Sequence, residues 1–265
     1  MRHASSDLNR MQFHDEGHGY DVFGMNPSDV AIAVRRLRFL YRTYFRVTSH
    51  GFEHIPSRGP AILAANHSGM LPIDAAMLYV DVIEHTDPPR VPRSVADTFV
   101  PRIPFLSTMF ARTGVTGGAR SNLHRLLDDG ELLMVFPEGT PGIGKPWRER
   151  YLLQEWRVGH VELAIRHRAP VVPVAVIGAE EQWPQIARVT GIRPFGAPWL
   201  PIPLTPVPLP VHYHIHYGQP MALHETWPPE CADDPTAVHE AAAVVKAAVT
   251  QLIGAGLRER RGVFR

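Results

Sequence analysis

The chain has little cysteine and little lysine. Cys231 is the single cysteine among 265 residues, so the sequence allows neither an intramolecular disulfide nor a zinc site built on several thiolates. Lys145 and Lys246 are the only lysines, so nearly all of the positive charge is arginine, whose planar guanidinium suits phosphate well. A net charge of +1 gives no whole-molecule argument for nucleic-acid binding. The positions of the arginines therefore matter more than their number.

Long hydrophobic runs are also lacking. No uninterrupted apolar stretch of about 18 residues occurs, so a membrane-spanning helix is not expected. Residues 1–25 are polar and have no apolar core of the kind found in secretory signals, and we expect them to form a flexible N-terminus. The sequence therefore predicts a cytoplasmic protein.

Residues 26–50 are predicted to form a basic amphipathic helix, capped by Asn26 or Ser28 with Pro27 in its first turn. Between residues 30 and 51 there are five arginines and no acidic residue. Such a helix is typical of an interfacial membrane anchor; the alternative is a helix docked on the domain with solvated arginines. The apolar stripe is Val34, Leu37, Tyr41, Tyr44 and Phe45, and the basic stripe is Arg35, Arg38, Arg42 and Arg46.

Alternating strands and helices predict one α/β domain over residues 51–265, with a central, largely buried mixed sheet flanked by helices. Strands are expected at 61–65, 91–97, 131–136, 171–178 and 211–218, and helices at 74–82, 121–129, 154–167 and 235–257. Residues 194–210 are apolar and rich in proline, so they can form neither a helix nor a central strand. We expect a packed surface loop there, or a loop that enters lipid or lines an acyl pocket.

A histidine and a carboxylate follow the first buried strand. His67 lies in the loop after that strand, and Asp74 begins the next helix. A carboxylate beside an imidazole fixes its tautomer and stabilises the imidazolium, so the pair is a candidate general base. By itself such a pair is more often structural.

Three further motifs follow in order. Residues 114–120 form a small-residue loop that brings Arg120 to a helix N-terminus, which is either a phosphate site or a flexible turn. The FPEGT motif at 136–140 places Glu138 and Gly139 at the end of a buried strand, where α/β sheets hold ligands. Pro173 interrupts the strand at 171–178, which by itself predicts an edge strand or a bulge.

Together the four motifs resemble the signature of the glycerolipid acyltransferase family, which includes lysophosphatidic acid acyltransferases. The resemblance covers about residues 60 to 180. It implies that His67, supported by Asp74, deprotonates an acceptor hydroxyl that attacks the thioester of acyl-CoA or acyl-carrier protein, with no metal or redox cofactor. It also implies that Arg120, Glu138 and Gly139 bind the polar, often phosphorylated acceptor and that Pro173 lies near the acyl donor.

Two positions depart from the family pattern. Six residues instead of four separate His67 from Asp74, so the loop has to bulge around Pro72 for the carboxylate to reach the ring. The arginine that usually follows Phe-Pro-Glu-Gly-Thr is Pro141. Its cationic role could pass to the run at 145–150, which contains Lys145, Arg148 and Arg150. Some diacylglycerol-forming members of the family are similar in having a longer gap.

The sequence thus predicts a peripheral membrane acyltransferase acting on a lysophospholipid or glycerolipid such as lysophosphatidic acid, with the basic stripe against the cytoplasmic face of the membrane. The alternatives are a lipid-binding protein without catalysis and a lipid ester or thioester hydrolase, although no Gly-x-Ser-x-Gly elbow occurs. Alternating His212, His214 and His216 could bind a metal, but a solvated strand face is the expected explanation.

Overall fold

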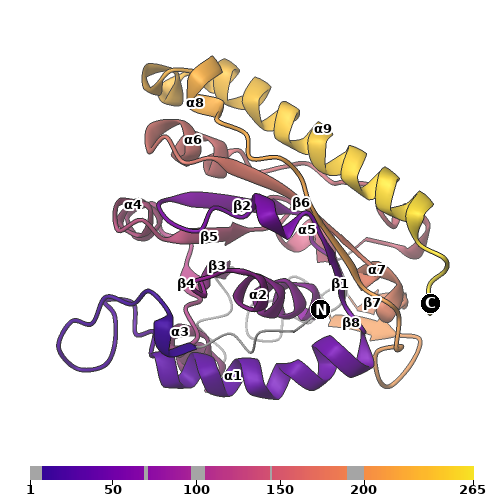
Figure 1. The fold of residues 1–265 in the computed structure, drawn as a ribbon. Coiled ribbons are helices and arrows are strands. Elements are labelled where there is room, and N and C mark those ends of the chain that lie inside the picture. The colour runs from indigo at the N-terminus through magenta and orange to yellow at the C-terminus, as the bar shows by residue number, and fades with distance from the viewer. Residues whose placement is uncertain (1–7, 69–70, 97–104, 144, 190–199) are drawn as a thin grey trace.

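The computed structural model describes residues 8–68, 71–96, 105–143, 145–189 and 200–265 (Figure 1). Its strands are β1 (Thr48–His50), β2 (Ala61–Ala65), β3 (Pro92–Ala96), β4 (Thr116–Gly117), β5 (Leu132–Val135), β6 (Val171–Ile177), β7 (Gln185–Val189), β8 (Leu200–Pro203) and β9 (His214–Tyr217). Its α-helices are α1 (Pro27–Phe39), α2 (Ile73–His85), α3 (Leu106–Arg112), α4 (Arg120–Asp128), α5 (Thr140–Ile143), α6 (Gly159–Arg166), α7 (Ala179–Gln182), α8 (Leu223–Thr226) and α9 (Pro235–Glu259).

A seven-stranded mixed sheet organises the molecule. Its order is β1-β9-β6-β2-β5-β3-β4. The strands from β6 to β4 are mutually parallel, whereas β9 runs antiparallel to β6 and β1 runs parallel to β9. The carboxyl ends of β6, β2, β5, β3 and β4 therefore share one edge, which is where parallel sheets usually carry their ligands.

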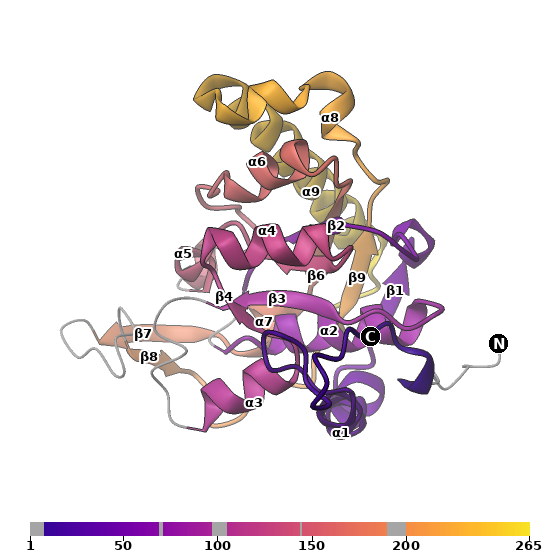
Figure 2. The same cartoon turned by 90° about the vertical axis from the view of Figure 1, so that its left-hand side faces the viewer.

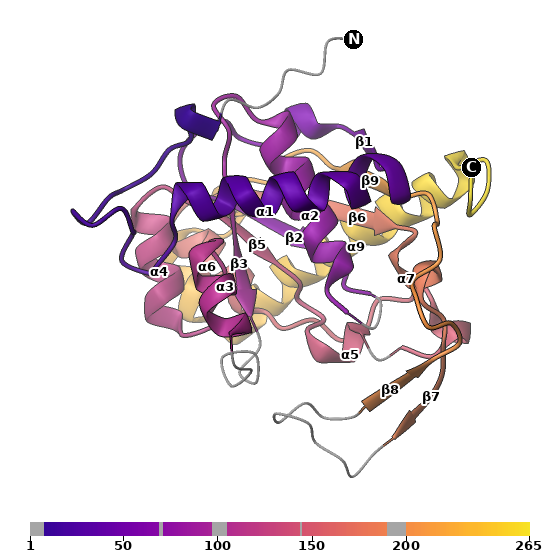
Figure 3. The same cartoon turned by 90° about the horizontal axis from the view of Figure 1, so that it is seen from below.

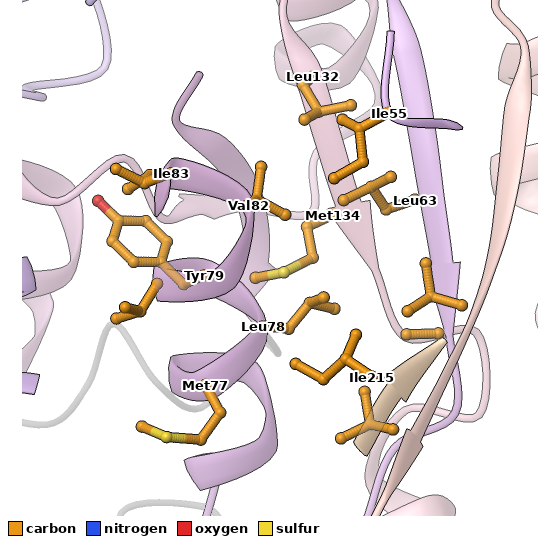
Figure 4. Close-up of a cluster of buried hydrophobic side chains, with 14 of the residues drawn as sticks. Ile55, Leu63, Met77, Leu78, Tyr79, Val82, Ile83, Leu132, Met134 and Ile215 are labelled. Carbon is orange, nitrogen blue, oxygen red and sulfur yellow. The ribbon is translucent and has the colours of Figure 1, made fainter. Parts of the chain in front are cut away.

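Helices cover both faces of this sheet (Figures 1 and 2). On one face α2 packs against the strands and α1 packs on α2, and Leu78 and Val82 of α2 meet Leu63 and Met134 (Figure 4). On the other face α4, α6 and α9 close a second core. Every residue of β2 and β6 is buried, as expected for strands covered on both sides. The predicted single α/β domain around a largely buried mixed sheet is confirmed.

One predicted helix is wrong in its first half. The amphipathic pattern at 154–167 becomes helical only at Gly159. Before that point the backbone N–H of Gln154 donates to the Glu138 carboxylate (2.7 Å), and that of Arg157 donates to the Pro137 carbonyl (2.9 Å). Because these amides donate to residues of the FPEGT turn, residues 154–157 run beside that turn and do not form a helix.

Pro173 lies in an interior strand, which corrects the expectation of an edge or a bulge. β6 pairs with β2 on one side and with β9 on the other. The antiparallel ladder with β9 ends at Val174, opposite Tyr217. The next residue along, Gly218, donates its N–H to the Pro173 carbonyl (2.8 Å), and a Cβ on Gly218 would lie 2.7 Å from the proline ring. The proline is tolerated because its missing N–H falls where the neighbouring strand has ended.

The N-terminal helix is docked on the domain. Asn26 caps α1 by accepting the N–H groups of Ser28 (2.9 Å) and Asp29 (3.2 Å). The helix continues through a π-helical turn at Leu40–Tyr44 and ends there. The predicted helix at 26–50 is therefore wrong in its last residues, where Thr48–His50 form β1, the edge strand of the sheet (Figure 3). The apolar side that an interfacial helix would place in lipid packs instead into the protein core, through Val34, Tyr41 and Phe45 among others.

Three arginines of the basic stripe are held by the protein itself. Glu84 of α2 pairs with Arg38 (2.6 Å) and with Arg42 (2.6 Å). Arg46 donates to the carbonyls of Tyr44 (2.8 Å) and Pro210 (2.7 Å). Arg35 is the one arginine of the basic stripe for which the described residues provide no ion pair or hydrogen bond, and its side chain is exposed.

The C-terminal helix α9 passes the length and hydropathy test for a membrane span, alone among the described helices. Asp234 caps it and Pro235 begins it. One side of the helix, which includes Ala241, Val245 and Val249, is buried in the second core. The helix therefore packs on the domain through one side and leaves the other side exposed.

The proline-rich segment contributes one strand outside the main sheet. Residues 194–199 lie outside the described residues, whereas β8 pairs antiparallel with β7 in a separate two-stranded sheet. Beyond β8 the chain is fastened by the Trp183 indole N–H, which donates to the Thr205 carbonyl (2.7 Å), and by Tyr44 Oη, which donates to the Pro208 carbonyl (2.5 Å). No central strand forms in the described part of this segment, as predicted.

Candidate active site

The carboxyl end of β2 carries a histidine–carboxylate pair. His67 Nδ1 lies 2.7 Å from Asp74 Oδ2, and both side chains are buried. The Phe136 ring packs on the imidazole with 4.4 Å between ring centroids. No hydrogen bond joins His67 Nε2 to another residue in the described part of the chain. One ring nitrogen is therefore held by the carboxylate, and the other remains for a proton from outside.

Asp74 reaches the histidine across the six-residue gap because it sits in the first turn of α2. Its Oδ2 also accepts the Ser68 N–H (2.9 Å), and its Oδ1 accepts the Ala75 N–H (2.8 Å). Gly69 and Met70, which lie in the gap, are outside the described residues. The backbone donors orient the carboxylate, and a carboxylate at a helix N-terminus is further stabilised by the helix dipole.

Asn66 aligns the loop with the sheet. Its side-chain amide exchanges two hydrogen bonds with the backbone of Val176 in β6, donating at 3.0 Å and accepting at 2.7 Å. The side chain thus continues the β2–β6 ladder where the β2 backbone leaves it. Sequence reasoning missed this residue, although its position directly before His67 is a usable signal.

Glu138 of the FPEGT motif points inward. Its Oε1 accepts the backbone N–H of His67 (3.0 Å), and its Oε2 accepts the Gln154 N–H (2.7 Å) and lies 3.4 Å from Lys145 Nζ. Lys145 is itself buried and also pairs with Glu180 (2.9 Å). Neither side chain is exposed where it could bind a substrate phosphate. Glu138 holds the backbone that carries His67, and Lys145 holds Glu138.

Two glycines pack the turn against the histidine. Gly139 has a positive φ of 56°, which disfavours side chains there. Its N–H donates to the Phe136 carbonyl (2.9 Å), so this amide is already used within the turn and is not aimed at an oxyanion. Gly142, which sequence reasoning missed, is close-packed, because a Cβ there would lie 2.9 Å from the His67 carbonyl oxygen.

Glu180 has a perturbed acidity. Burial raises the pKa of its carboxyl to about 7, against the opposing effect of the Lys145 charge. The carboxylate also accepts the Tyr151 N–H (2.8 Å). A pocket beside this pair is lined by Lys145, Glu180, Trp147 and Arg150 among others. Nothing in the sequence pattern marks Glu180, because its partner Lys145 lies 35 positions away.

The remaining predicted residues do not gather around His67. The Arg120 side chain is 70% exposed and pairs with Glu162 of α6 (2.7 Å), on the face of the sheet opposite α2. Arg148 is exposed, and Arg150 lies over the Trp147 ring at 4.7 Å from its centroid. Pro173 is buried inside β6. No hydrogen bond or ion pair joins any of these four to the histidine–carboxylate pair among the described residues.

An unpredicted arginine lies over the FPEGT turn. The guanidinium carbon of Arg157 would lie 3.2 Å from a Cβ on Gly139. Arg157 is exposed and forms no ion pair with a carboxylate in the described chain. Its backbone N–H is fixed to Pro137, so its place beside the turn is set by the backbone.

The predicted histidine stripe is reorganised in the structure. The His212 ring bonds to Thr48 Oγ1 (2.8 Å), and the residue that joins His214 and His216 is His50 of β1. These rings lie on the face of the sheet opposite the His67 pair, because β9 residues alternate and Tyr213, Ile215 and Tyr217 belong to the α2 side.

Comparison with known proteins places these features in a family. An acyltransferase family model matches residues 46–177. An uncharacterized protein of Mycobacterium tuberculosis is 38% identical over 255 residues, covering 92% of this chain and 71% of that one. The "DGAT1/2-independent enzyme synthesizing storage lipids" of Bos taurus is 32% identical over 132 residues, covering 47% of this chain and 36% of that one.

The fold also has a solved counterpart. The 1-acyl-sn-glycerophosphate (LPA) acyltransferase PlsC of Thermotoga maritima superposes with a TM-score of 0.58 at 16% identity, covering 89% of this chain and 80% of that one. The fold and the matched sequence define an acyltransferase. The chain belongs to the glycerolipid acyltransferase family.

Proposed function

We propose that the protein transfers a fatty acyl group from an acyl thioester, acyl-CoA or acyl-carrier protein, to a hydroxyl of a lysophospholipid or glycerolipid such as lysophosphatidic acid. The observation that carries this proposal is the 2.7 Å contact between His67 Nδ1 and Asp74 Oδ2. With Nδ1 protonated toward the carboxylate, Nε2 has a lone pair for the acceptor hydroxyl.

The reaction moves one proton from the acceptor hydroxyl to His67 and then from His67 to the leaving thiolate. The acceptor oxygen attacks the thioester carbonyl as His67 Nε2 takes its proton, and Asp74 stabilises the imidazolium. The carbon–sulfur bond then breaks, and the imidazolium returns the proton to the leaving thiolate. The products are an ester and a free thiol. The chain's own residues supply each of these roles without a metal or redox cofactor.

We propose Arg157 as the cation for an acceptor phosphate. Lys145, which the motif suggested, is buried between Glu138 and Glu180. Arg157 lies over Gly139 and is exposed, and a guanidinium binds phosphate in a bidentate manner. Arg150, beside Lys145 in the neighbouring pocket, is a second cation on this side.

The assay that tests the function supplies labelled acyl-CoA together with lysophosphatidic acid, monoacylglycerol or another lysolipid. We expect an acylated lipid and an equal amount of free thiol from the wild type. His67→Ala should lower kcat by about 10²–10⁴-fold, the usual contribution of a general base. His239→Ala, on the exposed side of α9, is the matched control and should keep full activity.

Other outcomes separate the alternatives. Thiol release without an acceptor would make the protein a hydrolase. Lipid binding without any turnover, for every acceptor tried, would make it a binding protein. Equal rates for His67→Ala and the wild type would overturn the assignment of the base.

We further propose that the outer face of α1 contacts the cytoplasmic surface of the membrane. This face carries Arg35 and Arg36, both exposed, and Phe39, which is 62% exposed. Exposed apolar side chains also lie on two neighbouring segments, namely α3, whose Arg112 carbonyl accepts the Asn26 N–H, and the proline-rich segment, which bonds to Tyr44. They are Phe105 and Met109 at the start and in the middle of α3, and Leu204 and Val207 in the proline-rich segment. Arginines near an anionic surface contribute about 1 kcal/mol each.

Vesicle sedimentation tests this face. The triple variant Arg35→Ser/Arg36→Ser/Phe39→Ser should bind vesicles of anionic phospholipid at least tenfold more weakly than the wild type. The matched control is Arg258→Ser/Arg261→Ser/Phe264→Ser, which removes two exposed arginines and an exposed phenylalanine at the C-terminal end. An equal loss in both variants would show only a general charge effect and would contradict the proposal.

A further inference from the structure

Three histidines converge at the edge of the main sheet, away from the acyl-transfer site. β1 and β9 pair in parallel with His50 directly opposite His216, and His214 lies two residues earlier on the same face. One ring nitrogen from each of the three lies within 4.8 Å of the others. The His50 ring is stacked on that of His216, with 4.4 Å between centroids.

These rings have nitrogen atoms without partners. In the described chain neither Nε2 of His214 nor Nε2 of His216 has a hydrogen-bond partner, and both are buried. The residue His216 is only 8% exposed. Buried polar atoms are nearly always satisfied, so these two neighbouring ring nitrogens are available to a ligand.

Helix α9 packs closely on one ring of this cluster. α9 crosses the sheet directly over His216 at Gly256, where a Cβ would lie 2.6 Å from His216 Nε2. A tetrahedral zinc ion with Zn–N bonds of about 2.1 Å separates its ligand nitrogens by about 3.4 Å. Movements of the three rings by about 1 Å, within their rotamer wells, close that difference.

We propose that His50, His214 and His216 bind a divalent transition metal of the zinc class, with solvent at the open position. Imidazole nitrogen is the ligand that such ions prefer. Because His50 comes from the three-residue strand β1 and the other two from β9, the ion would fasten the segment that follows α1 to the C-terminal half of the chain. The site is independent of the acyl-transfer reaction, since it lies on the other face of the sheet.

The test uses tag-free full-length protein stripped with a chelator. Titration with Co²⁺ should give the intense visible absorption of four-coordinate cobalt at one equivalent, and Zn²⁺ should displace it. Saturating Zn²⁺ should raise the thermal unfolding midpoint by about 5–10 °C, as expected for a ligand at about 100 times its dissociation constant.

Variants identify the ligands. His50→Gln, at an exposed edge position that tolerates replacement, should weaken cobalt binding by at least tenfold and abolish the thermal shift, and His214→Gln should do the same. His212→Gln removes a neighbouring histidine that bonds to Thr48 and should change neither readout. No four-coordinate cobalt spectrum in the wild type, or equal losses in all three variants, would overturn the proposal.

Discussion

Asp74→Asn is expected to lower kcat for acyl transfer by about 10³–10⁴-fold, the cost of presenting the wrong imidazole tautomer. The Asp74 oxygens face His67 Nδ1 and two backbone N–H groups. With its NH₂ toward the ring, asparagine donates to Nδ1 and moves the proton to Nε2, which then cannot act as a base. With its NH₂ toward Ala75, the amide NH₂ and the Ala75 N–H are two donors that face each other. Steady-state kinetics with saturating donor and acceptor measures the loss.

Asp81→Asn is the matched control for this variant. Asp81 lies on the same helix and is equally buried, and burial raises the pKa of its carboxyl. Its hydrogen-bond partners are the hydroxyls of Tyr41, Ser49 and Tyr217, which can rotate to accept from an amide, whereas backbone N–H groups cannot. The His85 ring also lies 3.5 Å from its Oδ1. Asp81→Asn should keep kcat within about threefold. A comparable loss in both variants, or retention of a tenth of the rate by Asp74→Asn, would remove Asp74 from the mechanism.

Glu138→Gln is expected to damage both stability and turnover. The new NH₂ would face the Gln154 N–H and the Lys145 ammonium, so donors would oppose donors in a buried site. Breaking a buried charge pair costs about 3–5 kcal/mol, which lowers the unfolding midpoint by roughly 6–20 °C in a chain of this size. Because Oε1 also holds the His67 N–H, kcat should fall by about 10–100-fold.

The kinetic pattern distinguishes the two roles given to Glu138. A residue that positions His67 lowers kcat and leaves the acceptor KM unchanged, whereas a residue that binds the acceptor raises KM. The double variant Glu138→Gln/Lys145→Met removes the opposed ammonium and should recover part of the lost stability. The recovery should be clearest near pH 6, where Glu180, whose pKa is about 7, is protonated. A raised acceptor KM with a normal kcat in Glu138→Gln would instead show that Glu138 binds the acceptor.

The motifs predicted that His67 and Glu138 follow buried strands, but they did not predict which strands lie side by side. His67, Glu138 and Arg120 each follow a parallel strand, and the carboxyl ends of parallel strands share an edge. Asp74 was also identified correctly as the partner of His67, because it is the only carboxylate in that loop. These inferences rest on local sequence and on a general property of parallel sheets.

Side-chain direction was not predictable in the same way. Glu138 turns inward because Gln154, sixteen positions later, offers its N–H, and Arg120 turns away because α6 places Glu162 beside it. The pairing of His50 with His216 depends on a three-residue edge strand, which is too short to produce a periodic pattern. Partners of this kind are set by packing between elements distant in sequence.

α2 links the proposed membrane face to the catalytic pair. Asp74 lies in its first turn, and Glu84 near its last turn binds Arg38 and Arg42 of the α1 segment. Ten residues of helix span about 15 Å, and a helix does not stretch. If α1 lies on the lipid surface as proposed, α2 therefore holds Asp74 at a fixed distance from the arginines of that segment.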